Sequence, residues 1–131
     1  MSAMGGMRII AADPDENSVV LAFECLPAFC HSGGRVAQGG FVTGWMDAAM
    51  AHAVIIHSDG PTNVASLDIN VRFLERVAPG PVHAFGRIVR RGRRVAFLEA
   101  RLMRPDGALL ATATSTAMLV PMANADDVSA G

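Results

Sequence analysis

The chain has 131 residues, of which 51% are apolar and 18% charged, and its formal net charge is −1. This length and composition exclude a disordered chain and predict one globular domain over residues 1–131, with a core over about residues 7–120 and a tail over 121–131. The near-zero charge excludes a general polycation, so we expect neither a nucleic-acid partner nor a membrane partner.

Two further features indicate the compartment. The N-terminal sequence MSAMGGMRII has no basic segment followed by an apolar one, so we expect no signal peptide. The two cysteines, Cys25 and Cys30, have neither zinc-site nor CxxC spacing, and no His, Cys and Asp residues have metal-ligand spacing. We therefore expect reduced thiols, no metal and a cytoplasmic protein.

Turn-forming residues divide the chain into short segments. Apolar segments at 7–12 and 18–23 flank the sequence DPDEN and predict two strands, and residues 26–37 predict a loop. Later segments at 66–73, 82–89, 95–103 and 109–120 are separated by the turn signals APGP, RRGRR and PDG. We expect these later segments to form an antiparallel meander.

Between the two groups of strands, residues 38–56 predict a helix that the sequence SDGP ends. Apolar residues occupy nearly every angle around its axis, which is typical of a buried helix. Its one charged residue, Asp47, has no basic residue three or four positions away. A carboxylate in this position is either paired from elsewhere in the fold or used for chemistry.

Residues 66–73 alternate strictly between polar and apolar. The odd-numbered residues, from Leu67 to Phe73, predict a face toward the core, and the even-numbered residues, from Ser66 to Arg72, predict a face toward water. Ser66 is the first residue of this strand, where alternation constrains a side chain least.

The lengths of these elements fit one another. A helix of about 16 residues spans about 24 Å, and a strand of about eight residues spans about 27 Å. We predict an α+β protein in which a curved antiparallel sheet wraps around one central helix. The open face and the edges of such a sheet need cover, so we expect a homodimer or a dimer of dimers.

The sequence also resembles a known family. The stretch GGRVAQGGFVTGWMDAAMAHAV, with an acid eight residues after the first glycine of its second Gly-Gly pair, is similar to the PaaI-like branch of the hotdog-fold acyl-CoA thioesterases. The sequences SLDINVRFLERVAPG and GRIVRRGRRVAFLEARLMRPDGALLATATSTAMLV extend the resemblance over roughly residues 18–120. It implies a hotdog fold and hydrolysis of an acyl- or aryl-CoA, with coenzyme A as part of the substrate and no other cofactor.

The resemblance implies catalytic roles for four residues. Gly39 matches the glycine whose backbone N–H polarises the thioester carbonyl, and Asp47 matches the carboxylate that acts as nucleophile or as base for water. Gln38 stands where many members have His and would orient the loop. Ser66 matches a hydroxyl that helps to position the attacking water in some members. In this family the glycine loop and the helix acid meet across the interface of a dimer with two sites.

These residue types suit thioester chemistry. Unpaired N–H groups at a helix N-terminus stabilise a developing oxyanion, and Gly39 and Gly40 let a substrate approach the backbone without a Cβ in the way. Asp47 lies about 12 Å along the helix from Gly39, which is too far to serve the same carbonyl. The partner's Asp47 is therefore required.

Further residues are candidates for binding the substrate. Arg93 and Arg94, in the RRGRR turn, predict either a site for the phosphates of coenzyme A or a solvated hairpin tip. In the loop before the helix, His31 is a candidate for touching substrate, and Ser32 stands where many family members have Asn. Gly40 and Trp45 are further candidates for contacting the substrate.

Two other functions remain open from the sequence. One is an acyl-CoA-binding protein without turnover. The other is a hotdog enoyl-CoA hydratase that uses Asp47 and His52, although residues five apart on a straight helix diverge by roughly 140°. Release of free thiol separates a thioesterase from both.

Overall fold

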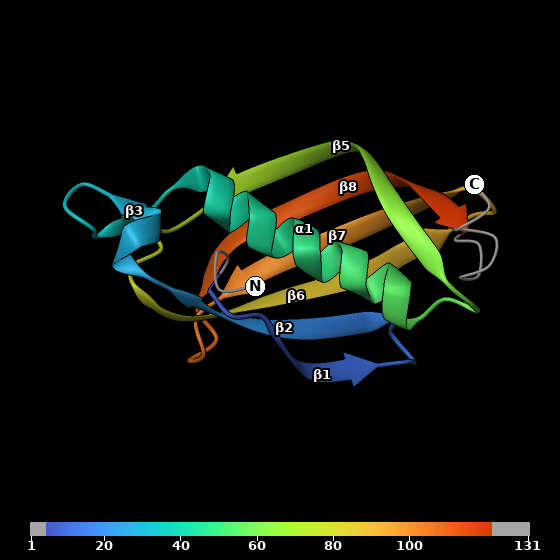
Figure 1. Cartoon of the computed structure of the whole chain (residues 1–131), viewed down its shortest axis with the longest axis horizontal. Helices are drawn as coiled ribbons and strands as arrows, with labels where there is room; N and C mark the ends of the chain where they lie inside the picture. The colour runs from blue at the N-terminus through green and yellow to red at the C-terminus, as the bar shows by residue number, and fades with distance from the viewer. Residues whose placement is uncertain (1–4, 122–131) are drawn as a thin grey trace, which may run out of the picture.

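The computed structural model describes residues 5–121, so the predicted tail lies outside the described residues apart from Pro121. A six-stranded antiparallel sheet has the order β1-β2-β6-β7-β8-β5 (Figure 1). Its strands are β1 (Arg8–Asp13), β2 (Ser18–Cys25), β5 (Thr62–Phe73), β6 (Gly80–Arg91), β7 (Val95–Met103) and β8 (Leu109–Pro121). The predicted loop holds a short 3-10 helix, η2 (Pro27–Phe29), and a small hairpin of β3 (Cys30–His31) and β4 (Val36–Ala37).

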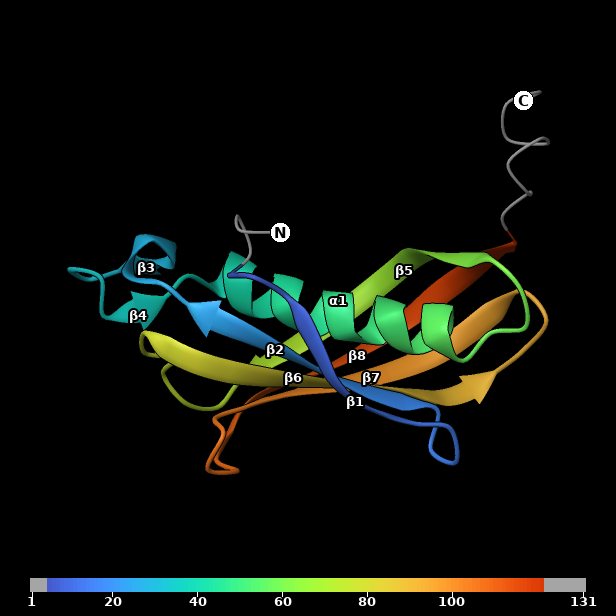
Figure 2. The same cartoon turned by 60° about the horizontal axis from the view of Figure 1, so that its bottom comes forward.

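The helix α1 (Gly39–Ile56) lies across one face of the sheet, which twists beneath it (Figures 1 and 2). The backbones of α1 and β6 touch, because a Cβ added to Gly86 would lie 2.3 Å from the carbonyl oxygen of Ala49. By length and composition alone α1 is also long and apolar enough to cross a membrane. Its buried residues pack on the sheet: Val42, Trp45, Met46, Ala49, Met50, Ala53 and Val54. The predicted α+β hotdog architecture is confirmed.

The composition of the helix predicted burial on all sides, and this prediction is wrong. Asp47 is exposed, and Ile55 and Ile56 expose 46% and 38% of their surface. This face of α1 is therefore partly uncovered in the single chain.

The predicted meander is wrong at its first strand. Strands β6, β7 and β8 are consecutive neighbours, but β5 pairs with β8 at the far edge and β6 pairs with β2. Residues 74–79 must therefore cross three strand spacings, about 14 Å, and six residues reach about 20 Å. We call this segment the crossover. Sequence order does not show it, because consecutive strands are more often neighbours.

Strand β5 also contains a β-bulge. Its pairing with β8 shifts register between Ser66 and Asp68, which leaves Leu67 as an extra residue with 57% of its surface exposed. Because side chains alternate along a strand, the extra residue brings Ser66 to the same face as Ile69, the face toward α1. The prediction that Leu67 faces the core and Ser66 the opposite side is therefore wrong.

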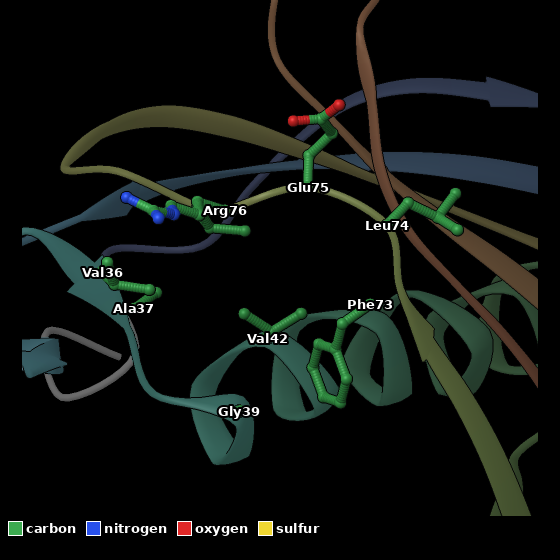
Figure 3. A pocket seen from close by; sticks show the side chains of 9 residues that line it. Val36, Ala37, Gly39, Val42, Phe73, Leu74, Glu75 and Arg76 are labelled. Atoms are coloured by element: carbon green, nitrogen blue, oxygen red, sulfur yellow. The ribbon is translucent and has the colours of Figure 1, made fainter.

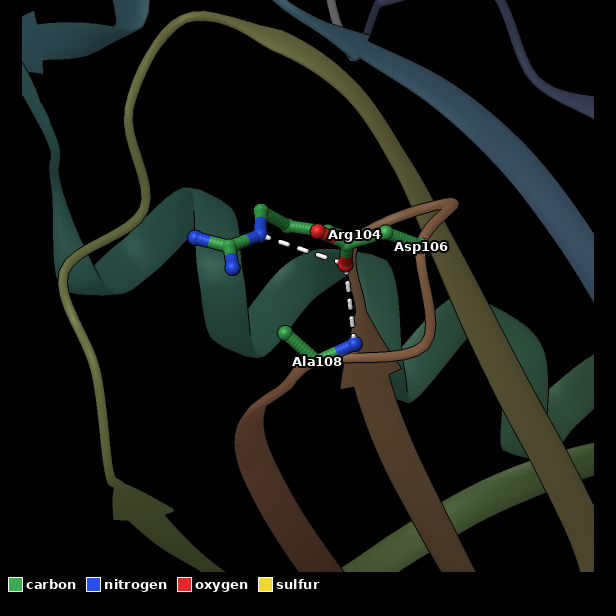
Figure 4. Close-up of polar contacts among 3 residues, drawn as sticks. All are labelled: Arg104, Asp106 and Ala108. Carbon is green, nitrogen blue, oxygen red and sulfur yellow. Dashed lines mark hydrogen bonds and ion pairs between the residues drawn. The ribbon is translucent and has the colours of Figure 1, made fainter.

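The turns predicted at RRGRR and PDG each join neighbouring strands, whereas APGP ends the crossover and closes no hairpin. In the turn between β7 and β8, the Asp106 carboxylate accepts a hydrogen bond from the Ala108 N–H at 3.0 Å and one from Arg104 Nε at 3.4 Å (Figure 4). The Ala108 amide first, and then Arg104, lowers the pKa of Asp106 below its ordinary value. Gly107 takes the left-handed φ of +95° that this turn needs.

Candidate active site

The first turn of α1 presents two free backbone donors. Gln38 caps the helix with extended φ and ψ of −67° and 142°, and no side-chain hydrogen bond caps this end. The carbonyl of Gln38 accepts from the N–H groups of Phe41 and Val42, whereas those of Gly39 and Gly40 donate no hydrogen bond within residues 5–121. Both glycines are exposed. Free N–H groups at a helix N-terminus attract negative charge.

The position of Gly39 is fixed by the segments on either side of it. The Gln38 N–H donates to the Phe29 carbonyl at 2.9 Å, and the Ala37 N–H donates to the Val77 carbonyl of the crossover at 2.7 Å. The Phe29 ring stacks on Phe41 of α1 with centroids 4.4 Å apart. Three contacts therefore hold the helix start between the loop and the crossover.

A cavity of about 580 Å³ opens beside Gly39, between the start of α1 and the crossover (Figure 3). A Cβ on Gly39 would lie 3.3 Å from the Phe73 ring, whereas the space beside Gly40 is open. The walls present polar and apolar surface in about equal parts, from Val36, Ala37, Gly39, Val42, Phe73, Leu74, Glu75, Arg76 and Val77. Phe73 and residues 74–77 were not predicted as site residues, because only the path of the crossover brings them beside α1.

Asp47 lies on the outer face of α1, and Ser66 lies beside it. The Ser66 hydroxyl donates to Asp47 Oδ1 at 3.3 Å, across from β5 to the helix. No ion pair joins Asp47 to an Arg in the part of the chain that the structure describes. The structure thus brings Ser66 and Asp47 together, but it leaves Gly39 about 12 Å away along the helix of the same chain.

Trp45 does not line the cavity. It has no exposed surface and packs in the core, with the rings of Phe23, Phe29 and Phe41 about it at centroid distances of 6.0, 6.4 and 6.3 Å. An aromatic residue on a core helix has the same sequence pattern whether it faces the sheet or a cavity.

His31 ends β3 and Ser32 begins the turn to β4, and both residues are exposed. His31 Nδ1 and the Ser32 hydroxyl are hydrogen-bonded at 2.8 Å. On α1, His52 is bonded through Nδ1 to the Ala48 carbonyl at 2.8 Å. No hydrogen bond joins Asp47 and His52 among the described residues.

Arg93 and Arg94 lie at the opposite end of α1 from Gly39. They form the turn between β6 and β7, and the neighbouring Arg91 donates to the Ser58 hydroxyl just beyond the helix C-terminus at 2.8 Å. Both line a concave surface with Val95 and Phe97. Within one chain they are therefore far from the free amides.

Comparisons with known proteins agree with this fold. A family model described as Thioesterase superfamily matches residues 34–111, more than half of the chain. A phenylacetic acid degradation-related protein of Ralstonia eutropha JMP134 is 30% identical, with 89% of this chain and 87% of that one covered and a TM-score of 0.81. No curated protein matches the sequence.

Two more distant structures share the fold. The Escherichia coli PaaI protein, from the phenylacetic acid degradation operon, is 17% identical over 91% of this chain and 82% of its own, with a TM-score of 0.79. A Streptococcus mutans UA159 protein bound to acetyl CoA is 17% identical over 88% and 90%, with a TM-score of 0.77. The chain belongs to the thioesterase superfamily, in its PaaI-like hotdog branch.

Proposed function

We propose that the protein hydrolyses the thioester of an acyl- or aryl-CoA to the free acid and coenzyme A. The observation that carries the proposal is the free N–H of Gly39, which lies beside a cavity at the start of α1. Membership of the thioesterase superfamily and the acetyl CoA bound to the Streptococcus mutans protein support a CoA thioester as the substrate.

The reaction adds the oxygen of water to the carbonyl carbon and breaks the carbon–sulfur bond, and the thiolate takes up a proton. Negative charge develops on the carbonyl oxygen, where the Gly39 N–H donates to it. Asp47 either attacks the carbonyl carbon or takes the proton of the attacking water. Ser66 orients the carboxylate by donating to Oδ1.

The active unit in this proposal is a homodimer. Because Asp47 is about 12 Å from Gly39 on its own helix, the partner's Asp47 completes each site. A two-fold axis that brings each Gly39 to the other Asp47 makes the two helices antiparallel about residue 43. The partner's hairpin at Arg93 and Arg94 then lies about 16 Å beyond Gly39 by the helix rise. This matches the extended pantetheine arm, so these Arg bind the phosphates of coenzyme A.

A proline at position 39 tests the role of the amide. Gly39 is the first helical residue and Gln38 is already extended, so Gly39→Pro fits the backbone and removes only the N–H. Gly39→Ala keeps the N–H and meets Phe73 in the same way, which makes it the matched control. We expect Gly39→Pro to lower kcat by roughly 10²–10³ relative to Gly39→Ala, measured as thiol release from a panel of acyl-CoAs. Equal rates for the two variants would contradict the role.

The same panel tests Asp47 and the two alternative functions. Asp47→Asn should abolish thiol release while the unfolding temperature stays within a few degrees of the wild type, because the side chain is exposed. Saturable acyl-CoA binding without thiol release by the wild type would instead indicate a binding protein. A hydrated product from an enoyl-CoA would indicate a hydratase.

A further inference from the structure

A second hollow adjoins the cavity beside Gly39. It has a volume of about 580 Å³ and is lined by His31, Ser32, Arg35, Val36, Arg76 and Ala78. Val36 and Arg76 line both spaces, so the two lie side by side. In Figure 3 the Arg76 side chain leaves the crossover and runs toward Val36, away from Phe73.

The charge in this hollow is unbalanced. Arg35 donates through Nε to the Ser32 carbonyl at 3.0 Å, and Arg76 makes no hydrogen bond or ion pair within residues 5–121. No Asp or Glu lines the hollow, and the Glu75 carboxylate points away from α1 and from Arg76 (Figure 3). Two guanidinium groups that line one concave surface repel each other. An oxyanion bound between them offsets this repulsion.

Both Arg residues come from fixed backbone. Three successive residues with left-handed φ, Ser32 at +56°, Gly33 at +73° and Gly34 at +79°, form the turn, which the Arg35 N–H closes by donating to the His31 carbonyl at 3.1 Å. A left-handed serine is uncommon and is kept where the surrounding structure enforces it. On the crossover, the backbone bonds of Glu75 to Leu110 and of Val77 to Ala37 flank Arg76.

We propose that Arg35 and Arg76 bind a carboxylate at the far end of the acyl group, so that the substrate is an ω-carboxyacyl thioester. The proposal rests on the hydrolysis proposed above and names its substrate class. Val36 precedes Gly39 by three residues and pairs with His31, so the hollow lies about 10 Å from the Gly39 amide. A fully extended acyl chain covers that distance in about eight bonds. The methylene groups between would contact Val42 and Phe73 of the cavity.

The test compares thioesters that differ only at the far end. We expect kcat/KM for suberyl-CoA to exceed that for octanoyl-CoA by roughly ten- to a hundredfold, the usual effect of a charge-assisted Arg–carboxylate contact. Arg76→Gln should remove this preference by slowing suberyl-CoA by that factor, and should slow octanoyl-CoA, whose far end carries no charge, by much less. Arg8→Gln, which removes a positive charge from the exposed strand β1, is the matched control and should change neither rate. The absence of a suberyl preference, or an equal loss for both substrates in Arg76→Gln, overturns the proposal.

Two further measurements distinguish the ways in which this proposal and the proposed hydrolysis could each be wrong. If Arg76→Gln slows octanoyl-CoA but not octanoyl-pantetheine, the hollow binds a phosphate of coenzyme A, and the carboxylate assignment is overturned. If the wild type hydrolyses neither substrate, calorimetry with the intact thioesters replaces kinetics. Tighter binding of suberyl-CoA that Arg76→Gln abolishes would then support the carboxylate site while refuting hydrolysis.

Discussion

At the scale of single residues, the Cys25 thiol has a pKa far above its ordinary value. It exposes 1% of its surface at the end of β2, and its sulfur lies 3.7 Å from that of Cys30. Burial first, and then the hydrogen bond and charge of Cys30, raise its pKa from 9.0 to about 12. At neutral pH the folded protein therefore holds Cys25 as a neutral, unreactive thiol.

This shift predicts a loss of stability in alkali. The raised pKa favours the neutral thiol in the folded state, so its contribution is complete below about pH 9 and declines as the pH rises toward about 12. Urea unfolding from pH 7 to 10.5 should show the free energy of unfolding falling more steeply above pH 9 in the wild type than in Cys25→Ala. Identical slopes in the two proteins would refute the assignment.

At the scale of elements, hydrogen bonds to Asp68 stabilise the β-bulge in β5. Asp68 accepts the Thr116 N–H through Oδ1 at 2.9 Å, and its carbonyl accepts the Ser115 hydroxyl at 2.7 Å. Ser66 stays paired opposite Ala117 and Asp68 opposite Thr116, so Leu67 alone is outside the ladder. The bulge thus adds a residue without disturbing the pairs on either side of it.

Deleting Leu67 should therefore be tolerated. The pairs on both sides keep their partners and Ser66 stays beside Asp47, so we expect stability within about 1 kcal/mol of the wild type, as for surface changes, and retained thiol release. Deleting Asn70 is the contrasting control, because it moves the Asp68 carboxylate to the inward, partly buried position of Ile69, at a cost of about 1–3 kcal/mol. Urea unfolding compares the two, and equal losses would show that Leu67 is part of the ladder.

The same elements show what the sequence predicts and what it does not. Alternation and turn residues predicted most strands, and an apolar run ended by SDGP predicted the helix. The resemblance to the hotdog thioesterases, and not periodicity, proposed Gly39 and Asp47 for the candidate site. Leu67 was misplaced because a bulge leaves no mark in an alternating pattern. The cavity was missed because the partner of β5 depends on long-range packing, which local periodicity does not encode.

At the scale of the whole molecule, one side exposes apolar side chains together with Asp47. The outer face of α1 exposes Asp47 and Ile55, and the edge strand β5 exposes Leu67 and Phe73. An edge strand with apolar side chains and a half-covered helix suit pairing with a second copy. This is the arrangement that the proposed two-subunit site needs.

Mixed dimers test the shared site directly. Asp47→Ala and Gly39→Pro proteins should each be inactive, but a dimer of one with the other has one site with both groups intact. Refolding them together at equal amounts should restore roughly a quarter of wild-type thiol release, since half of the dimers are mixed and each has one working site. Two different affinity tags would isolate the mixed dimers, and inactive ones would exclude a site shared between subunits.

The crossover has a consequence for how such a protein is retargeted. Backbone hydrogen bonds join Leu74 and Glu75 to Leu110, and Val77 to Ala37. Glu75, Arg76 and Ala78 lie outside the strands of the sheet. All three residues line the cavity beside Gly39 or the adjoining hollow. The wall that we propose selects the acyl group can therefore be changed at a few positions of a connecting segment, while the helix and sheet that hold Gly39 and Asp47 stay as they are.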